Sequence, residues 1–349
     1  MNHFRSILIS ILIGALLAGA SVYFWMNGKI KSQEALQSQL LSQKEDQIEA
    51  TRNSSLVRLM ANVLDLMDDE LKANPRRILS DETIARVAAL CYSFRPYTHP
   101  EGDSLGAKKL SPEKGQLLLA ISSMRMDSAS LHKIFYEASF RDADLRDADL
   151  SNRDLNGIDL NGAYLRGTKL NGANLTGADL SFADLWGANL REAILQTAKL
   201  KRANLSWADL SGADLRKADF NEADLISAQL RKADMQYTNL RWTDLSGAFL
   251  IETDLDSADM FRAVLKRAQL TKANMHGVNL NNAILSEANL TEVNLSAANM
   301  VDMVLSDQYW TELLDGWKVT GAQEIQHKYK VTEGVSYENS KYKLVLSGK

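Results

Sequence analysis

The chain has 349 residues, of which 45% are hydrophobic and 24% are charged, with a formal net charge of −4 at pH 7. This composition excludes a globally disordered chain and a strongly basic nucleic-acid binder. The single cysteine, Cys91, excludes an internal disulfide. Its place in the apolar run Val87–Tyr92 predicts a small buried side chain and not a reactive thiol.

The first predicted element is a membrane-spanning helix within residues 1–29. Ile7–Met26 contains no charged residue over 20 positions, which at ~1.5 Å per residue spans a bilayer core. The alternative is a cleavable signal peptide that ends at Ala18–Ala20. Because the apolar run continues six residues past that site, an uncleaved single-pass anchor is favoured. The basic residues on the two flanks favour neither orientation, so the side of the soluble region stays open.

The next segment, residues 30–55, is polar and free of proline, and it predicts a helical stalk that continues from the anchor. Gln43 and Gln47 interrupt its heptads, so a coiled coil has only weak support. Residues 56–137 predict a small helical domain. Three N-cap patterns mark its later helices, at Ser80, at Ser111-Pro112, and at Asp127 or Ser128.

Residues 138–305 form an uninterrupted run of five-residue repeats. Every fifth residue from Phe140 to Leu305 is large and apolar: 28 of these 34 positions hold Leu, two hold Phe and four hold Met. Two residues earlier, 25 of 34 positions hold Ala, and the position between holds Asp or Asn in 23 of 34. A period of five fits neither a helix nor a strand, so the backbone must turn once per repeat, as in a solenoid.

These residues resemble the pentapeptide-repeat family, whose unit is written A-(D/N)-L-x-x. The resemblance implies a mainly β fold, a right-handed, four-sided β-helix with four repeats per coil and about eight and a half coils. Within that fold, Leu fills the interior, Ala fits the crowded axis, and Asp or Asn accepts hydrogen bonds from turn amides. Glycines two residues after Leu, such as Gly157 and Gly187, mark tight turns.

Because the resemblance implies four repeats per coil, positions four repeats apart stack in columns, and two outward groups depart from the repeat. The first is a candidate interaction patch, because Trp and other aromatic residues are typical of binding surfaces; it consists of Phe182, Trp186, Trp207 and Ile226. The alternative is that the stalk or the helical domain folds over this patch.

The second group is an apolar strip in the column that usually holds Asp or Asn: Val264, Ile284 and Val304. An exposed apolar strip needs a cover. The predicted cover is the chain's own tail, in which Tyr342–Leu346 is expected to form a strand; a homodimer contact is the alternative. Residues 306–349 are expected to form a cap helix, with Trp310, Leu313 and Leu314 over the last coil, followed by this strand.

At the other end, His132–Glu137 is expected to cap the first coil, because an open coil presents unpaired backbone groups. Arg153 replaces Ala at an inward position of that coil. Because an unpaired buried charge is strongly unfavourable, its side chain is expected to leave the interior toward the capping helix and to act as a structural contact of the cap.

The sequence therefore predicts a non-catalytic, membrane-tethered scaffold or protein-interaction module with an unidentified protein partner. The alternative is a DNA mimic that inhibits or protects a topoisomerase. The repeat region has 18 basic and 23 acidic residues, a net charge of −5, against about 24 charges for duplex DNA of similar length. Both this mimicry and binding of nucleic acid are therefore disfavoured. No cofactor, metal or catalytic site is expected, because the five histidines are scattered and no phosphate-loop or nucleophile motif occurs.

Overall fold

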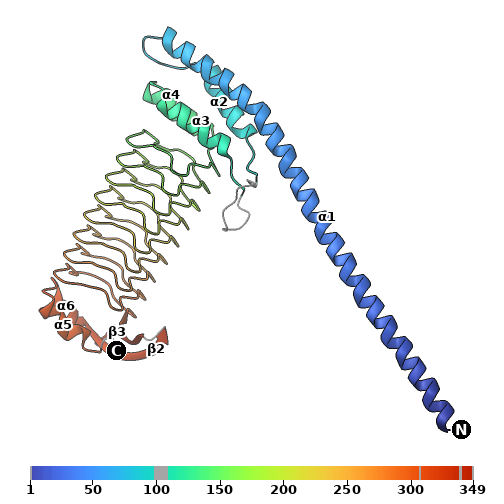
Figure 1. The fold of residues 1–349 in the computed structure, drawn as a ribbon. Helices are drawn as coiled ribbons and strands as arrows, with labels where there is room; N and C mark the ends of the chain where they lie inside the picture. Colours follow the sequence, from blue (N-terminus) through green and yellow to red (C-terminus); the bar gives the residue numbers. More distant parts are fainter. Residues whose placement is uncertain (1, 98–108, 306–307, 338–339, 348–349) are drawn as a thin grey trace. The chain divides into compact units, whose positions relative to one another are not determined.

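The computed structural model describes residues 2–97, 109–305, 308–337 and 340–347. Within these ranges, the side chains of 2–28 and 334–341, and those of residues 30, 45, 46, 49, 50 and 53, lie outside the description. The chain divides into two compact units, Met1–Ser54 and Ser55–Lys349 (Figure 1).

Helix α1 (Asn2–Ala73) spans the boundary: its part up to Ser54 belongs to the first unit and the rest belongs to the second unit. Residues 30–55, for which the sequence predicts a helical stalk, lie within this helix, and every described side chain between residues 31 and 54 is exposed. Their role as a stalk stays a prediction. Across the part of the chain that the structure describes, no helix has an apolar stretch long enough to cross a membrane. The predicted anchor, Ile7–Met26, has its side chains outside that part.

The second unit begins with the end of α1 and three short helices, α2 (Asp81–Ser93), α3 (Pro112–Ser123) and α4 (Ser128–Glu137). The predicted N-caps are confirmed. The Ser80 hydroxyl accepts the Thr83 N–H, Ser111 accepts the Lys114 N–H, and Asp127 accepts the Ser130 N–H. Each cap supplies an acceptor for a backbone donor that the helix itself leaves unpaired.

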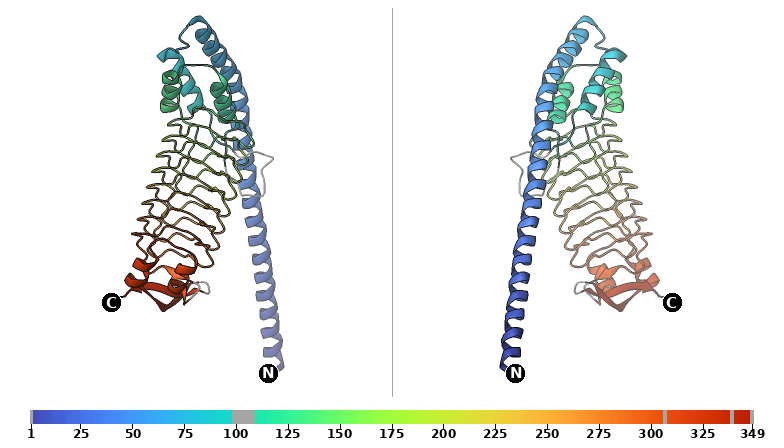
Figure 2. Two further views of the ribbon diagram at one scale, coloured as in Figure 1. Left: turned by 90° about the vertical axis from the view of Figure 1, so that its left-hand side faces the viewer. Right: turned by 90° about the vertical axis from the view of Figure 1, so that its right-hand side faces the viewer.

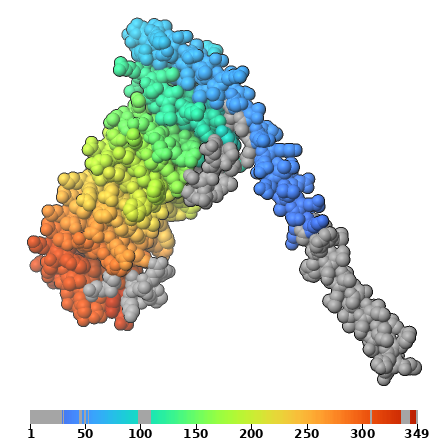
Figure 3. All heavy atoms as spheres, in the orientation of Figure 1, coloured from blue at the N-terminus to red at the C-terminus, as the bar shows by residue number. Residues whose placement is uncertain are grey.

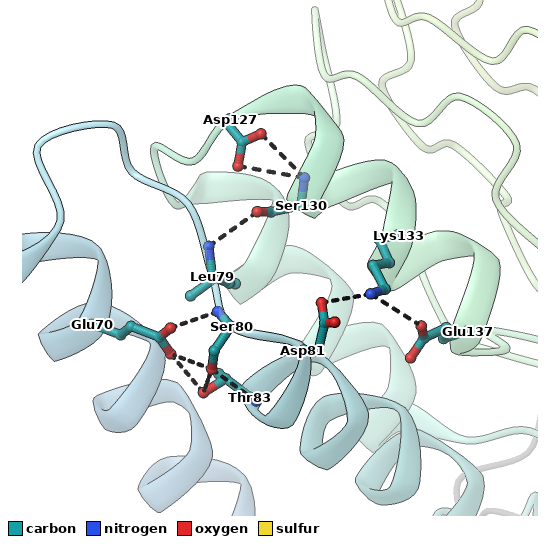
Figure 4. A network of polar contacts seen from close by, with 9 residues as sticks. All are labelled: Glu70, Leu79, Ser80, Asp81, Thr83, Asp127, Ser130, Lys133 and Glu137. Atoms are coloured by element: carbon teal, nitrogen blue, oxygen red, sulfur yellow. Dashed lines mark hydrogen bonds and ion pairs between the residues drawn. The ribbon is translucent and has the colours of Figure 1, made fainter.

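Polar contacts join these helices to one another (Figure 4). On α1, Glu70 accepts hydrogen bonds from the Thr83 hydroxyl at 2.6 Å and from the Ser80 N–H. The hydrogen bond from Thr83 is the largest contribution to a lowered Glu70 pKa. On α4, the Ser130 hydroxyl oxygen accepts the Leu79 N–H at 3.0 Å, so α4 also holds the start of α2.

The helices pack directly on the first coil. The Ser111 N–H donates to the Asp142 carbonyl at 2.9 Å, and the Asp144 N–H donates to the Ser111 carbonyl at 3.1 Å. Ser111 therefore pairs with the first coil as an additional rung. Cys91 is fully buried and donates its Sγ–H to the Ser139 carbonyl at 2.9 Å. Burial raises the pKa of this thiol to about 11, which agrees with the predicted inert role.

The predicted cap segment His132–Glu137 lies within α4 and also contacts the first coil. His132 Nε2 lies 2.9 Å from Asp154 Oδ2, and the rings of Phe135 and Phe140 meet edge to face at 6.1 Å. The first coil is thus closed by α3 and α4 together, whereas the sequence indicated only α4.

The repeats form a stacked solenoid between the helices and the C-terminal elements (Figure 2). Bridges join residues whose numbers differ by 20, such as Asp144 with Tyr164 and Asp159 with Asp179, and they are parallel. Bridges recur at every fifth residue, so each coil has four sides, as the resemblance implied. In Figure 3, successive parts of the repeat region follow one another along the unit in chain order.

The interior is formed by the repeat's large apolar residue, which is at most 3% exposed at all 34 positions. Alanine lines the same interior. Arg153 is the departure considered above, and its side chain is exposed. Where threonine replaces alanine, its hydroxyl is satisfied inside: Thr243 donates to the Phe220 carbonyl at 2.9 Å and Thr253 donates to the Leu230 carbonyl at 2.6 Å.

Each repeat closes with a tight turn. In the first such turn, the Ala143 N–H donates to the Phe140 carbonyl at 3.2 Å. The second residue after the large apolar residue has a positive φ throughout, at Gly157 (72°) and Gly187 (63°) as expected, and also at non-glycine residues such as Trp207 (63°). This conformation is typical of a type II turn.

The C-terminal cap contains α5 (Trp310–Gly316), α6 (Ala322–Lys328), β2 (Tyr329–Tyr337) and β3 (Ser340–Leu346). The predicted strand Tyr342–Leu346 is confirmed within β3, which pairs antiparallel with β1 (Val304–Leu305) and with β2. Thr320 adds another rung by bridging Asn294.

Two expectations need correction. The solenoid is built from isolated bridges, and among the described residues only β1, β2 and β3 are strands, so the term mainly β overstates its regular strand content. The reason is the turn in every repeat, which leaves one paired residue per side. At the C-terminal end, Trp310 and Leu314 are buried as expected, but Leu313 is 37% exposed and does not cover the last coil.

A candidate interaction surface on one side of the solenoid

Each side of the solenoid is defined by one column of bridged residues. The column of interest holds Asp144, Tyr164, Asp184, Asn204, Asp224, Asp244, Val264, Ile284 and Val304. We define the aromatic face as this column together with the turn on each side of it. In the second coil these turns are residues 161–162, after Leu160, and residues 166–167, after Leu165, and both recur every 20 residues. Six of the eight aromatic residues at outward repeat positions lie on this face: Tyr164, Phe182, Trp186, Trp207, Trp242 and Phe261.

The predicted interaction patch lies wholly on the aromatic face. Phe182 is 53% exposed, Trp186 is 46% exposed and Trp207 is 63% exposed, while Ile226 is half-buried. Phe182 and Trp186 border Asp184 on one coil. Trp207 lies on the next coil, and its N–H donates to the Ile226 carbonyl at 3.0 Å. Within the described chain, no ring contact joins Trp186 to Trp207, so the patch is a set of neighbouring anchors and not one stacked cluster.

Trp186 belongs to a ladder in which arginines and rings alternate. The Tyr164 ring contacts two guanidinium groups, those of Arg146 and Arg166, whose Cζ atoms lie 5.2 Å and 5.3 Å from the ring centroid. Arg166 Cζ also lies 5.7 Å from the Trp186 ring, and its Nε donates to Asp184 Oδ2 at 2.8 Å. This ladder fixes the side chain of Trp186 against the surface, which reduces the entropy that it would lose on binding.

The structure adds a second cluster that sequence reasoning missed. Trp242, which is 48% exposed, meets Phe261 edge to face at 6.2 Å. Arg241 Cζ lies 4.4 Å from the Phe261 ring, and Arg262 Cζ lies 4.5 Å from the Trp242 ring. The signal was available, because Trp242 occupies the same position of its coil as Phe182, three coils further along the same turn.

The apolar strip continues this face toward the C-terminal end. Val264 bridges Ile284, which bridges Val304, and all three side chains are half-buried. The two groups that the sequence separated, the patch and the strip, thus lie on one side of the solenoid.

The tail meets the strip at its end. Val304 pairs with Lys343, and the Leu344 N–H donates to the Met303 carbonyl at 3.0 Å. Lys343 Nζ lies 3.1 Å from Asp302 Oδ1. β3 thus extends the column as a further rung beyond Val304, and its recorded pairing does not reach Val264 or Ile284. Cover of the strip by the tail stays a prediction, and a homodimer contact stays the alternative.

Turn chemistry explains the acidic side chains of the repeat. Asp224 Oδ1 accepts the Ile226 N–H at 3.0 Å, and Asp244 Oδ1 accepts the Ser246 N–H at 2.9 Å. The described residues contain no group of three or more His, Cys, Asp or Glu side chains arranged to hold a metal ion. The aspartates of the face therefore act in turn closure, and the chemistry that the face offers is contact with apolar and cationic groups.

This geometry defines a repeat-solenoid protein with one aromatic side. The model of the family described as "Pentapeptide repeats" matches in eight copies, over residues 134–162, 158–196, 198–236, 238–277 and 273–307. The repeat region therefore belongs to the pentapeptide-repeat family. No curated protein matches the chain by sequence.

Several solved structures are similar to the repeat region. HetL, a pentapeptide repeat protein involved in heterocyst differentiation regulation in Nostoc, shares 29% identity over 52% of this chain and 98% of its own, with a TM-score of 0.20. Rfr23 from Cyanothece shares 38% identity over 29% and 58%, with a TM-score of 0.17. QnrB1, a plasmid-mediated fluoroquinolone resistance protein, shares 16% identity over 51% and 96%, with a TM-score of 0.29. These TM-scores are too low for the likenesses to bear on function.

Proposed function

We propose that this protein is a non-catalytic scaffold that binds a partner protein through the aromatic face. The observation that carries the proposal is the exposure of Phe182, Trp186, Trp207 and Trp242, between 46% and 63%, on one side of the solenoid. Tryptophan is enriched among the residues that dominate binding energy at protein interfaces.

Three of these residues occupy the turn position at which φ is positive throughout the solenoid. Phe182, Trp207 and Trp242 have φ of 61°, 63° and 62°, a region that is unfavourable by about 1–2 kcal/mol for side chains with a Cβ. Gly187, in the column of Trp207 one coil earlier, shows that glycine fits the same turn. A large exposed ring at this position contributes little to the core, so its value is expected in binding.

We further propose that residues 1–29 anchor this scaffold in a membrane as an uncleaved single pass, with residues 30–55 as a stalk. The support is the uncharged stretch Ile7–Met26 together with the uninterrupted helix from Asn2. Protease accessibility of the repeat region in intact cells tests this arrangement. Release of the chain from washed membranes by high salt or carbonate would contradict the anchor.

The alternative, topoisomerase protection by DNA mimicry, receives no support from the charges of the solenoid. Several of its acidic groups are paired with cations along the rod, as in Arg202 with Glu222 and Arg267 with Glu287 at 2.7 Å. Inhibition of DNA supercoiling by the purified chain at micromolar concentration would restore that alternative.

The binding role is tested by crosslinking in the native membrane, followed by mass spectrometry. We expect the double variant Trp186→Ser/Trp207→Gly to lose the partner that the wild type captures. The matched control is Gln196→Ser/Lys217→Gly. It introduces the same residues, Ser and Gly, at the equivalent turn positions on another side of the solenoid. Capture of the same partner by both double variants, at unchanged melting temperature, would exclude the aromatic face as the docking site.

A further inference from the structure

Arg262 differs from the other arginines that contact rings on the aromatic face. Arg166 and Arg241 each contact a ring and also pair with a carboxylate, Asp184 and Asp259, at 2.8 Å and 3.0 Å. Arg262 Cζ lies 4.5 Å from the Trp242 ring and 5.4 Å from the Phe261 ring. Among the described residues, no carboxylate forms an ion pair with Arg262.

The coil that carries Arg262 has an unusual charge. Residues 260–279 contain four basic side chains and no Asp or Glu, although the whole chain has a net charge of −4. Other basic residues of this coil face carboxylates of the next coil: Arg267 pairs with Glu287 at 2.7 Å and Lys272 with Glu292 at 3.8 Å, and the charge of Lys266 contributes to a lowered Glu287 pKa. Of the four basic residues in this coil, Arg262 is therefore the one without a carboxylate partner in the described part of the chain. Its positive charge is available to an external anion.

Contact with two rings prepares the Arg262 guanidinium for binding. Contact with Trp242 and Phe261 restricts the side chain and removes part of its hydration, while the N–H groups at its edge keep their donor geometry. A planar guanidinium pairs with a carboxylate through two parallel hydrogen bonds. The apolar strip begins two residues later at Val264 and continues through Ile284.

We propose that the aromatic face binds an acidic, aliphatic segment of the partner protein. An Asp or Glu carboxylate of that segment pairs with Arg262, and its neighbouring aliphatic side chains pack on Val264 and Ile284. This inference rests on the proposed function and names the chemistry of its partner. A nucleic acid fits less well, because a phosphate chain along this face would meet Asp244 on one neighbouring coil and Glu287 on the other.

The test uses the full-length chain in mild detergent and a displayed library of short random peptides. We expect the selected peptides to contain Asp or Glu next to Val, Ile or Leu. The best peptide should bind roughly tenfold more weakly to Arg262→Gln. The matched control is Arg231→Gln, since Arg231 also lies over a ring, that of Phe249 at 5.5 Å, but on another side. This control should leave the affinity unchanged.

A double-mutant cycle locates the carboxylate. If the peptide's acid pairs with Arg262, its change to Gln or Asn should weaken binding to the wild type but have little further effect on Arg262→Gln. Additive losses would overturn the pairing. Basic peptides, an empty selection, or equal losses with Arg231→Gln would overturn the proposal.

Self-association provides the competing outcome. If the full-length chain forms dimers that Ile284→Asn dissociates, the strip is occupied by a second copy and the proposal fails. The crosslinking result with Trp186→Ser/Trp207→Gly is independent of this outcome. If the crosslinking variant loses its partner but the peptide selection yields no acidic peptide, the proposed function is retained and only this inference is overturned.

Discussion

The aromatic face and a neighbouring side of the same solenoid share the backbone conformation and the apolar interior. They differ in the residues of their outward columns. The second side, which we name the Asp/Asn side, holds Asp159, Asp179, Lys199, Asp219, Asn239, Asp259, Asn279 and Asn299. There, Asn239 and Asn279 donate to the aspartates one coil earlier at 2.8 Å. On the aromatic face, Val264 and Ile284 stand in the equivalent positions without such bonds. The polar ladder is therefore dispensable for coil stacking, and the outward column is free to serve binding.

The largest effect should test whether the interior is common to both sides. Leu185 on the aromatic face and Leu200 on the Asp/Asn side are both fully buried. Each Leu→Ala change should lower the free energy of unfolding by about 2–5 kcal/mol, because it removes buried methyl groups and leaves a cavity. Urea denaturation measures both losses. A much smaller loss for Leu185→Ala would show that the aromatic face has a looser core.

The next effect tests whether the turns are equivalent. Gly187 borders the aromatic face and Gly177 borders the Asp/Asn side, with φ of 63° and 67°. A Cβ at Gly187 meets nothing within 4 Å, and one at Gly177 meets only Thr197 Oγ1 at 3.9 Å. Both Gly→Ala variants should therefore lose about 1 kcal/mol from backbone strain alone. Thermal melts that separate the two variants would indicate different turn geometries.

A change of opposite sign should distinguish the rings of the face from core rings. Trp207→Gly removes a side chain that is 63% exposed, and it removes the strain that a residue with a Cβ has at this positive φ. The chain should keep its stability or gain up to about 1 kcal/mol, whereas loss of a buried aromatic side chain is destabilising by about 3–5 kcal/mol. The same melts provide the measurement. A clear loss of stability would mean that Trp207 packs against the fold.

The smallest effect concerns another polar side, on which Asp214 and Asp234 stack one coil apart. The hydrogen bond from Arg216 is the main cause of a lowered Asp214 pKa, whereas burial is the main cause of a raised Asp234 pKa. Asp214 therefore stabilises the fold above its unfolded pKa near 3.8, and this contribution is lost as pH falls through the lower folded pKa. Asp234 has the opposite sign, because its folded form binds the proton more tightly.

At neutral pH, Asp214→Asn should lower the melting temperature and Asp234→Asn should raise it slightly. Below about pH 3 the difference between the Asp214→Asn variant and the wild type should shrink, because the wild-type carboxylate is then increasingly protonated. Melting curves across this range measure both trends, and a destabilised Asp234→Asn variant at neutral pH would contradict the assigned sign.

Much of the fold is predictable from sequence because one local rule repeats. Leu at every fifth residue indicates which positions lie inside, the resemblance to the family adds the coil of four repeats, and the glycines identify the turn conformation. Residues without a periodic signal were harder to place. Ser111 joins the first coil as a rung although it lies outside the repeats, and Thr320 does the same at the other end.

The candidate surface was only partly predictable for a related reason. Trp186 and Trp207 depart from the repeat and are visible as exceptions. The pairing of Arg262 with Trp242 and Phe261 depends on side-chain directions at adjacent coils, which the column position does not specify. The outward direction of Arg153 was correctly expected from the unfavourable burial of an unpaired charge.

Two residues from outside the repeats pair with the ends of the aromatic face: Ser111 before the first coil and Lys343 after Val304. They determine how the molecule tolerates changes in length. A gain or loss of four repeats between them adds or removes a whole coil and keeps both end structures on the same side. A gain or loss of a single repeat would shift the last rung by one side, so that the tail strand would no longer continue the column of Val304. Viable size variants should therefore differ by whole coils.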